Sequence, residues 1–171
     1  HWPSLAKKGP PLLKLFRGEH LSRHALIVDT FFTGQEDVFE AAISVAASFA
    51  VTETTAEARL DLLFVHPEIF SFTESHGVAH AQQLLQVLAR VTAERKKPFI
   101  NLSGLVIAQA AAINAAVLVL LAWDSARQSL VRRLMVLGIP LRVLLIVPAG
   151  TENDFTTEPL GDNPQWLRIL E

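Results

Sequence analysis

The sequence predicts an α/β fold: a doubly wound, mostly parallel sheet with helices on both faces and one short antiparallel edge strand. Three observations predict it. Short, wholly apolar runs recur along the chain, segments with helical periodicity separate them, and several of the runs end in acids, hydroxyls or prolines. Runs that are apolar on both faces are typical of buried parallel strands, and their alternation with helices predicts right-handed crossovers in a three-layer, Rossmann-like arrangement.

The first half of the chain is expected to supply a central strand, a helix and a hairpin. Three prolines and a glycine exclude a regular helix from residues 1–11, and residues 12–17 predict a short edge strand. The run 24–29 predicts the centre of the sheet. Small apolar residues recur every three or four positions over 36–50 and predict a helix. A strand over 60–65, stopped by His66 and Pro67, is expected to return antiparallel over 69–73.

The second half is expected to supply three more helices and two more parallel strands. The charge-free run 104–123 has the length of a membrane span, but Gln109 and Asn114 interrupt it, so we expect a buried helix followed by a buried strand. Asn101 or Ser103 is expected to cap that helix. The predicted elements are helices over 78–94, 101–113 and 126–137, strands over 116–122 and 141–147, and a final strand or docking segment over 166–170.

Composition limits the class of protein and of partner. The 171 residues, of which 50% are hydrophobic and 19% charged, predict one domain with a heavily buried interior. Its expected parts are a lead-in over 1–23, a core over 24–148 and a tail over 149–171. The net charge of -2 gives no reason to expect nucleic acid or an anionic membrane as partner. The absence of cysteine excludes disulfides, thiolate metal sites and cysteine nucleophiles.

The order of features resembles a known family. The start of the domain-of-unknown-function 58 family resembles three stretches at the start of this chain: His1-Trp2, Ser4-Leu5-Ala6-Lys7-Lys8-Gly9 and Leu12-Leu13-Lys14-Leu15-Phe16. The "L-L-L-D-T" strand end of that family resembles the strand end at Asp29-Thr30. The resemblance implies a von Willebrand factor A-like domain cut from a longer protein. It also implies a membrane anchor upstream of this segment, a place on the cytoplasmic side of the membrane, and an assembly role beside a MoxR-type AAA+ ATPase rather than catalysis.

The resemblance also implies where a metal would bind. Related A domains hold Mg²⁺ with an Asp-x-Ser-x-Ser loop, a threonine from a second loop and an aspartate from a third. Asp29 matches the first position, Thr33 the last, and Asp124 the third-loop acid, whereas Phe31 replaces the middle serine. The second-loop threonine has no clear counterpart, with Asn101 and Ser103 only nearby. We therefore expect a degenerate site and no cofactor, with weak Mg²⁺ binding as the alternative.

The same residues also have purely structural interpretations. A capping box fits Thr33-Gly34-Gln35-Glu36 at the helix over 36–50, and the same pattern fits Ser125-Ala126-Arg127-Gln128 at the helix over 126–137. Asp29 is expected to bond neighbouring loops and helix amino ends. His76 and His80 have the i,i+4 spacing of a zinc helix, but Gly77 stands where H-E-x-x-H has its glutamate, so we expect a solvent-facing helix start.

These observations favour a non-enzymatic protein-interaction domain. Its partner surface is expected at the carboxyl edge of the sheet, where open α/β sheets bind their ligands. An exposed Phe31 or Phe32 is a candidate apolar anchor there, although one of the two is expected to pack beneath the loop. The alternative is a metal-dependent, ligand-binding or hydrolytic enzyme that uses the same edge. The residues expected to form this edge are Asp29, Thr30, Phe31, Thr33, Asn101, Ser103, Asp124 and Ser125.

Overall fold

A computed structural model of the chain describes residues 22–52, 58–65, 69–72, 78–151, 155–161 and 167–170. Its sheet has the strand order β3-β2-β1-β4-β5-β6. Neighbouring strands are parallel except for β3, which pairs antiparallel with β2. The fold is therefore α/β with a doubly wound, mostly parallel sheet, as the alternation of apolar runs and helical segments predicts. The predicted edge strand over 12–17 lies outside the described residues.

The elements follow one another in the predicted order. The strands are β1 (Ser22–Val28), β2 (Ala58–Val65), β3 (Ile69–Phe72), β4 (Ala115–Leu120), β5 (Leu141–Ile146) and β6 (Leu167–Leu170). The helices are α1 (Glu36–Thr52), α2 (Val78–Leu88), α3 (Ile100–Gln109) and α4 (Ser125–Val136), with a short 3₁₀ turn over Ala110–Ala112. Gly138 follows α4 with a φ of 74°, a left-handed conformation that glycine adopts without strain and that ends the helix as predicted.

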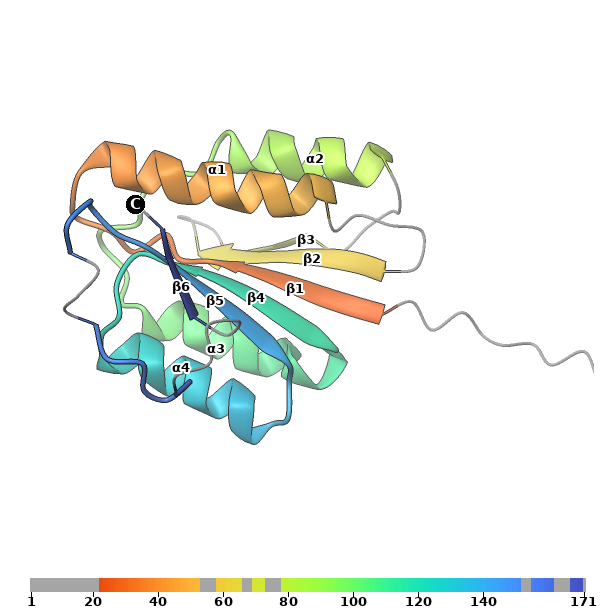
Figure 1. Cartoon of the computed structure of the whole chain (residues 1–171). Helices are drawn as coiled ribbons and strands as arrows, with labels where there is room; N and C mark the ends of the chain where they lie inside the picture. The colour runs from red at the N-terminus through yellow and green to blue at the C-terminus, as the bar shows by residue number, and fades with distance from the viewer. Residues whose placement is uncertain are drawn as a thin grey trace, which may run out of the picture.

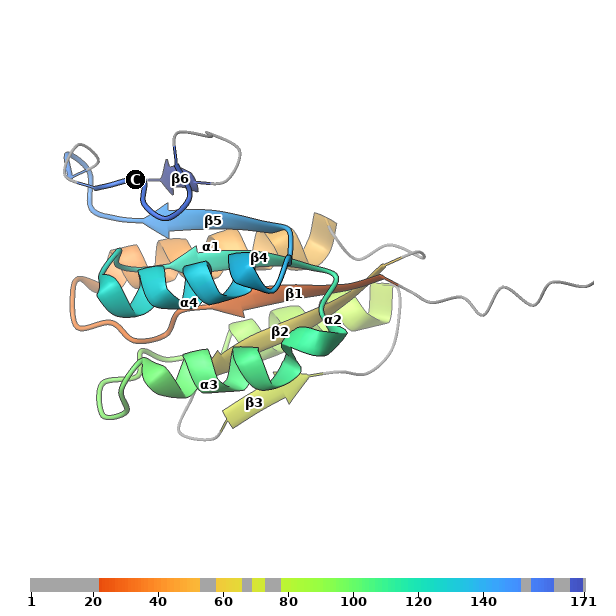
Figure 2. The same ribbon diagram turned by 90° about the horizontal axis from the view of Figure 1, so that it is seen from below.

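The helices form two layers with the sheet between them (Figure 1). α1 and α2 cover one face, and α3 and α4 cover the other, where Figure 2 shows them lying side by side. β1 is central because it pairs with β2 on one side and β4 on the other, as in Leu26 opposite Leu62 and Val117. The carboxyl ends of β1 and β4 therefore meet at one edge of the sheet, called the carboxyl edge below.

Alternating side chains of the central strands build two separate cores. Leu26 and Val28 of β1 face α1 and α2, where the alanines Ala42 and Ala46 let α1 pack closely on the sheet. Ala25 and Ile27 face α3 and α4 in the second core. All four β1 residues are buried, because both faces of the strand are covered by helices. This burial explains why residues 25–28 are all apolar.

Two predicted helix boundaries are wrong. α2 ends at Leu88 rather than 94, because the chain leaves the helix and the Glu94 amide donates to the Thr30 carbonyl, 2.7 Å away. The Glu94 side chain then accepts from the amides of Lys96 and Lys97. α3 begins at Ile100 with Phe99 at its N-cap and no side-chain cap bond, so neither Asn101 nor Ser103 caps it.

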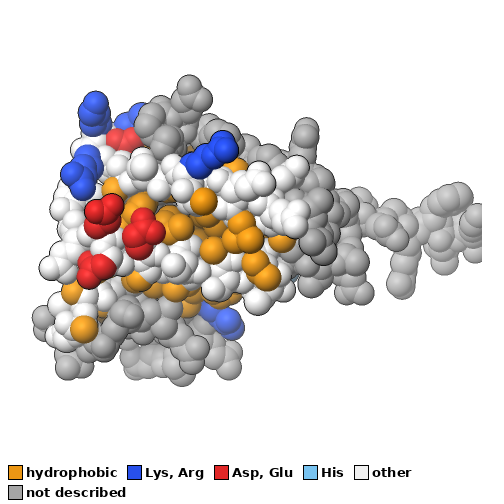
Figure 3. All heavy atoms as spheres, turned by 90° about the horizontal axis from the view of Figure 1, so that it is seen from above, with side chains coloured by type: hydrophobic (Ala, Val, Ile, Leu, Met, Phe, Trp, Pro, Cys, Tyr) orange, Lys and Arg blue, Asp and Glu red, His pale blue; other side chains and the backbone are white. Residues whose placement is uncertain are grey.

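The outer surface of α1 is acidic where the helix begins. Glu36, Asp37 and Glu40 are exposed there, and Figure 3, which looks onto α1 and α2, shows acidic side chains gathered at that end. Negative charge in a first turn is stabilised by the helix dipole. Within the described ranges, no helix has the length and apolar character needed to cross a membrane.

Candidate functional site

Asp29 lies directly after β1 and is completely buried. Its amide donates to the Val119 carbonyl at 2.9 Å, which continues the pairing of β1 with β4. Its Oδ1 accepts from the Phe31 amide at 3.0 Å, and its Oδ2 accepts from the Leu121 amide at 3.1 Å. The carboxylate therefore binds its own loop to the end of β4, which confirms the prediction that Asp29 bonds neighbouring loops.

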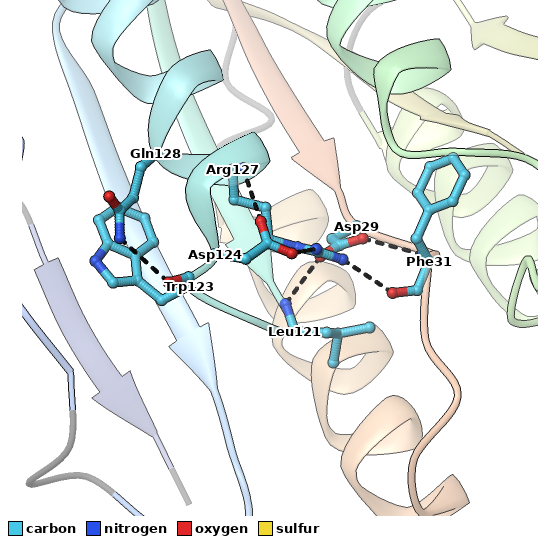
Figure 4. Close-up of polar contacts among 7 residues, drawn as sticks. All are labelled: Asp29, Phe31, Leu121, Trp123, Asp124, Arg127 and Gln128. Carbon is cyan, nitrogen blue, oxygen red and sulfur yellow. Dashed lines mark hydrogen bonds and ion pairs between the residues drawn. The ribbon is translucent and has the colours of Figure 1, made fainter.

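Arg127, in the first turn of α4, supplies a cation to this carboxylate (Figure 4). Its Nε donates to Asp29 Oδ2 at 2.6 Å, and its Nη1 donates to Asp124 Oδ2 at 2.5 Å. Its Nη2 donates to the Phe31 carbonyl at 3.0 Å. The side chain is only 6% exposed. One guanidinium thus joins the two acids that the sequence placed at this edge, and it also holds the loop after β1.

Sequence reasoning did not identify Arg127, although the sequence contains a signal. A cation in the first turn of a helix is disfavoured by the helix dipole, because the amino end of a helix carries partial positive charge. An arginine at that position therefore needs a local anion. Asp124, three residues earlier, and Asp29, at the end of the neighbouring strand, provide two.

Burial and pairing shift the pKa values of both partners. Burial raises the pKa of the Asp29 carboxyl, and the hydrogen bond and charge of Arg127, with the amides of Leu121 and Phe31, oppose that rise. Burial lowers the pKa of the Arg127 guanidinium, but the contacts with Asp29 and Asp124 outweigh it, so this pKa is raised. The guanidinium therefore stays cationic inside the edge.

Aromatic rings pack around the guanidinium rather than projecting into solvent. Phe31 lies edge-on to Phe99, with ring centroids 5.7 Å apart and planes at 71°. The guanidinium carbon of Arg127 lies 4.6 Å from the Phe99 centroid, within the range of a cation–π contact. Phe31 packs against the α3 and α4 core and Phe32 against the α1 and α2 core. Neither phenylalanine is an exposed anchor, so that expectation is wrong.

Neither predicted helix cap is found on the residue that the sequence pattern indicated. α4 has Asp124 as its N-cap, whose Oδ1 accepts from the Arg127 amide at 3.0 Å, so Ser125 is not the cap. Aspartate accepts this bond with a full charge, which favours it at an amino end. α1 begins at Glu36, so Gln35 rather than Thr33 precedes its first residue, and Thr33 is exposed.

The remaining predicted site residues lie near the edge but outside the Arg127 network. Thr30 is buried, and its hydroxyl donates to the Val65 carbonyl, which joins the ends of β1 and β2. Ser103 is buried in the first turns of α3, and Asn101 is half-buried beside it. The structure thus brings together Asp29, Phe31 and Asp124.

The described residues do not fit a divalent cation at this edge. Mg²⁺ requires several oxygens in near-octahedral geometry. Both Asp29 oxygens accept N–H donors, the Arg127 guanidinium already bridges Asp29 to Asp124, and Phe31 turns its ring toward Phe99. Across the described ranges, no cluster of three or more His, Asp or Glu side chains is arranged to hold a metal. Because Asp29 is also inaccessible, it cannot contact a substrate as a base while this network is intact.

The histidine prediction requires a correction. His80 is completely buried on α2 rather than exposed to solvent. Its Nε2 lies 2.7 Å from the Leu60 carbonyl, so it joins α2 to β2 inside the core. His76 lies outside the described residues. His80 is therefore a packed core histidine.

Two comparisons with known proteins were negative, so the interpretation of the carboxyl edge rests on its geometry. No family model matches the chain, and no curated protein matches it. The chemical content of the edge is clear from its residues. Two acids and one arginine form this network, in which Asp29 and Arg127 are buried and Asp124 is exposed, and exposed residues such as Ile100 and Thr33 lie around it.

Proposed function

We propose that this chain is a non-enzymatic protein-interaction domain of the von Willebrand factor A type that binds its partner through the carboxyl edge. The observation that supports this proposal is the pairing of Arg127 with both acids of the edge. Asp29 and Asp124 share its guanidinium, so the acids that catalysis or metal binding would need serve instead to fix the loops. A rigid edge presents its neighbouring side chains in one geometry, which lowers the entropic cost of binding a partner.

The exposed side chains at this edge define the contact surface of the proposal. Ile100 opens α3 and is 62% exposed, so its apolar side chain is available to a partner at this edge. Asp124 is 51% exposed on its side of the network. An apolar anchor beside charged groups is the usual composition of a protein-binding surface. Ile100 therefore takes the anchoring role that the sequence assigned to Phe31 or Phe32.

The wider setting of the proposal comes from the family resemblance of residues 1–30. On that basis the domain belongs to a larger, membrane-anchored protein and lies on the cytoplasmic side of the membrane. Its partner is a MoxR-type AAA+ ATPase, and the domain acts in assembly. Asp29 and Thr30, which carry part of the resemblance, lie at the carboxyl edge.

A direct binding measurement tests the proposal. The 171-residue chain is immobilised and titrated with a purified MoxR-type AAA+ ATPase, with and without ATP, by biolayer interferometry. The Ile100→Asp variant is expected to weaken binding about tenfold or more, because it places a charge at the centre of an apolar contact.

Val51→Asp is the matched control. Val51 is 55% exposed, close to Ile100, but it lies at the far end of α1 on the other face of the sheet. It is expected to bind as the wild type does. Failure of the wild type to bind the ATPase, or equal weakening by both variants, would contradict the proposal.

A further inference from the structure

The outer face of the α3 and α4 layer carries a second feature, remote from the carboxyl edge. A groove of about 450 Å³ lies beside α4 toward its carboxyl end, with Ile107 of α3 on its other side. Figure 2 looks onto the two helices that border it. Its lining residues are Ile107, Ser129, Arg132, Arg133, Val136 and Leu137.

The end of α4 projects apolar side chains into solvent here. Val136 is 83% exposed, the largest value among the exposed large hydrophobic residues of the described chain, and Leu137 is 56% exposed. A second hollow of about 340 Å³ lies nearby and includes Met135, Pro140 and Leu141. Exposed apolar side chains between two hollows favour contact with a partner, because water solvates such a surface poorly.

The two charged side chains that line the groove are both arginines. From 98 to 141 the charged residues are Asp124, Arg127, Arg132 and Arg133. Asp124 and Arg127 pair with each other at the carboxyl edge. Arg132 and Arg133 are exposed, and neither belongs to an ion pair within the described part of the chain. The groove is therefore apolar with a cationic side.

We propose that this groove binds an amphipathic helix of a partner protein whose apolar stripe is bordered by acidic side chains. The apolar stripe would cover Val136, Leu137 and Ile107, and the acids would meet Arg132 and Arg133. Helix-in-groove recognition uses apolar anchors three and four positions apart, with charge at the rim setting orientation. The stretch from Ser129 to Leu137 spans about 12 Å of helix, which corresponds to a partner helix of two to three turns.

The groove favours a protein helix over a lipid surface, because side chains of a partner helix can fill the space between Ile107 and the exposed Val136 and Leu137. Charge also disfavours the basic segment of this chain that precedes β1, since Lys7, Lys8, Lys14 and Arg17 would face Arg132 and Arg133. An acidic partner helix satisfies both the shape and the charge.

The test uses synthetic peptides and the 171-residue chain. The probe is a fluorescein-labelled helix of about 18 residues with leucines at i, i+3, i+4 and i+7 and glutamates beside them, long enough to be partly helical alone. Its binding is followed by fluorescence anisotropy at low and high salt. Two comparison peptides carry lysine in place of glutamate, or the same composition in scrambled order.

The glutamate peptide is expected to bind in a salt-dependent manner and about tenfold tighter than either comparison peptide. The double variant Arg132→Glu, Arg133→Glu is expected to reverse the preference toward the lysine peptide. Val136→Asp is expected to weaken the glutamate peptide. Arg90→Glu, on the exposed surface of the opposite layer just after α2, is the matched control and is expected to bind as the wild type does.

Several results would overturn the proposal. Equal binding of the glutamate and lysine peptides would show that the arginines do not select the ligand. Binding of phosphatidylserine vesicles without binding of the peptide would assign the face to a membrane. Self-association in analytical ultracentrifugation that Val136→Asp abolishes, again without peptide binding, would assign it to a second copy, whose α1 carries the exposed acids Glu36, Asp37 and Glu40.

Discussion

Replacing Arg127 by methionine removes the cation from the carboxyl edge while keeping an unbranched side chain of comparable length. The guanidinium makes three contacts that methionine cannot make: with Asp29 at 2.6 Å, with Asp124 at 2.5 Å and with the Phe31 carbonyl at 3.0 Å. The substitution leaves Asp29 completely buried without a counter-ion. The variant therefore tests whether the arginine holds the edge together.

The expected loss of stability follows mainly from the buried pair. Removing one partner of a buried ion pair costs about 3–5 kcal/mol, because the other charge remains desolvated. The pair with the half-exposed Asp124 adds only about 0.3–0.5 kcal/mol, since water screens it. The cation–π contact with Phe99 adds about 0.5–2 kcal/mol. These terms overlap, so we expect the free energy of unfolding to fall by about 4 kcal/mol.

Urea unfolding at neutral pH, followed by tryptophan fluorescence and circular dichroism, measures this loss. The double variant Asp29→Asn, Arg127→Met is the control, because it removes the anion together with the cation. It is expected to recover about 1–2 kcal/mol relative to Arg127→Met alone. A loss below about 1 kcal/mol for Arg127→Met, the size of an ordinary surface pair, would refute the view that this contact frames the edge.

Three further predictions follow from the same structure. Without Arg127 the pKa of Asp29 rises further above its ordinary value of 3.8, so the contribution of Asp29 to the stability of Arg127→Met is expected to be lost as pH rises from 3.8 through the raised pKa. Urea titrations across pH measure this loss relative to the wild type, and a difference that does not change with pH would contradict it. Asp124→Ala removes the N-cap of α4 and is expected to cost about 1 kcal/mol in the same assay, whereas an unchanged midpoint would speak against the cap. Leu160→Ala empties a buried site in the α3 and α4 core and is expected to cost about 2–5 kcal/mol, against less than about 0.5 kcal/mol for the exposed Leu137→Ala.

The periodicity of the sequence was sufficient to predict most of the fold. Runs such as 24–29 and 116–122 are apolar on both faces because helices cover both sides of the sheet, so their burial can be recognised from the sequence alone. Their carboxyl ends meet at one edge, which placed Asp29 and Asp124 near each other. This inference needs only that parallel strands end on the same side.

The predictions failed where a distant residue decides a local structure. α2 stops at Leu88 because the Glu94 amide bonds to the Thr30 carbonyl, a pairing that no local pattern encodes. Asp124 rather than Ser125 caps α4, although both are common cap residues, and its carboxylate also meets Arg127. His80 is buried where α2 packs on the sheet, and the Leu60 carbonyl, 2.7 Å from its Nε2, satisfies that ring nitrogen. The sequence placed Asp29 and Asp124 at the same edge, but it did not identify the cation that joins them.

The long sequence separation within the Asp29–Arg127 pair has a consequence for folding during synthesis. Arg127 follows Asp29 by 98 residues, and Leu121, the other distant donor to the carboxylate, follows it by 92. At about 5–20 residues per second, the ribosome makes the anion about 5–20 s before its counter-ion. During that interval the half-sheet of β1 and β2 can form with α1, but burying Asp29 would leave its charge uncompensated. The carboxyl edge should therefore close last, when α4 emerges and delivers the guanidinium.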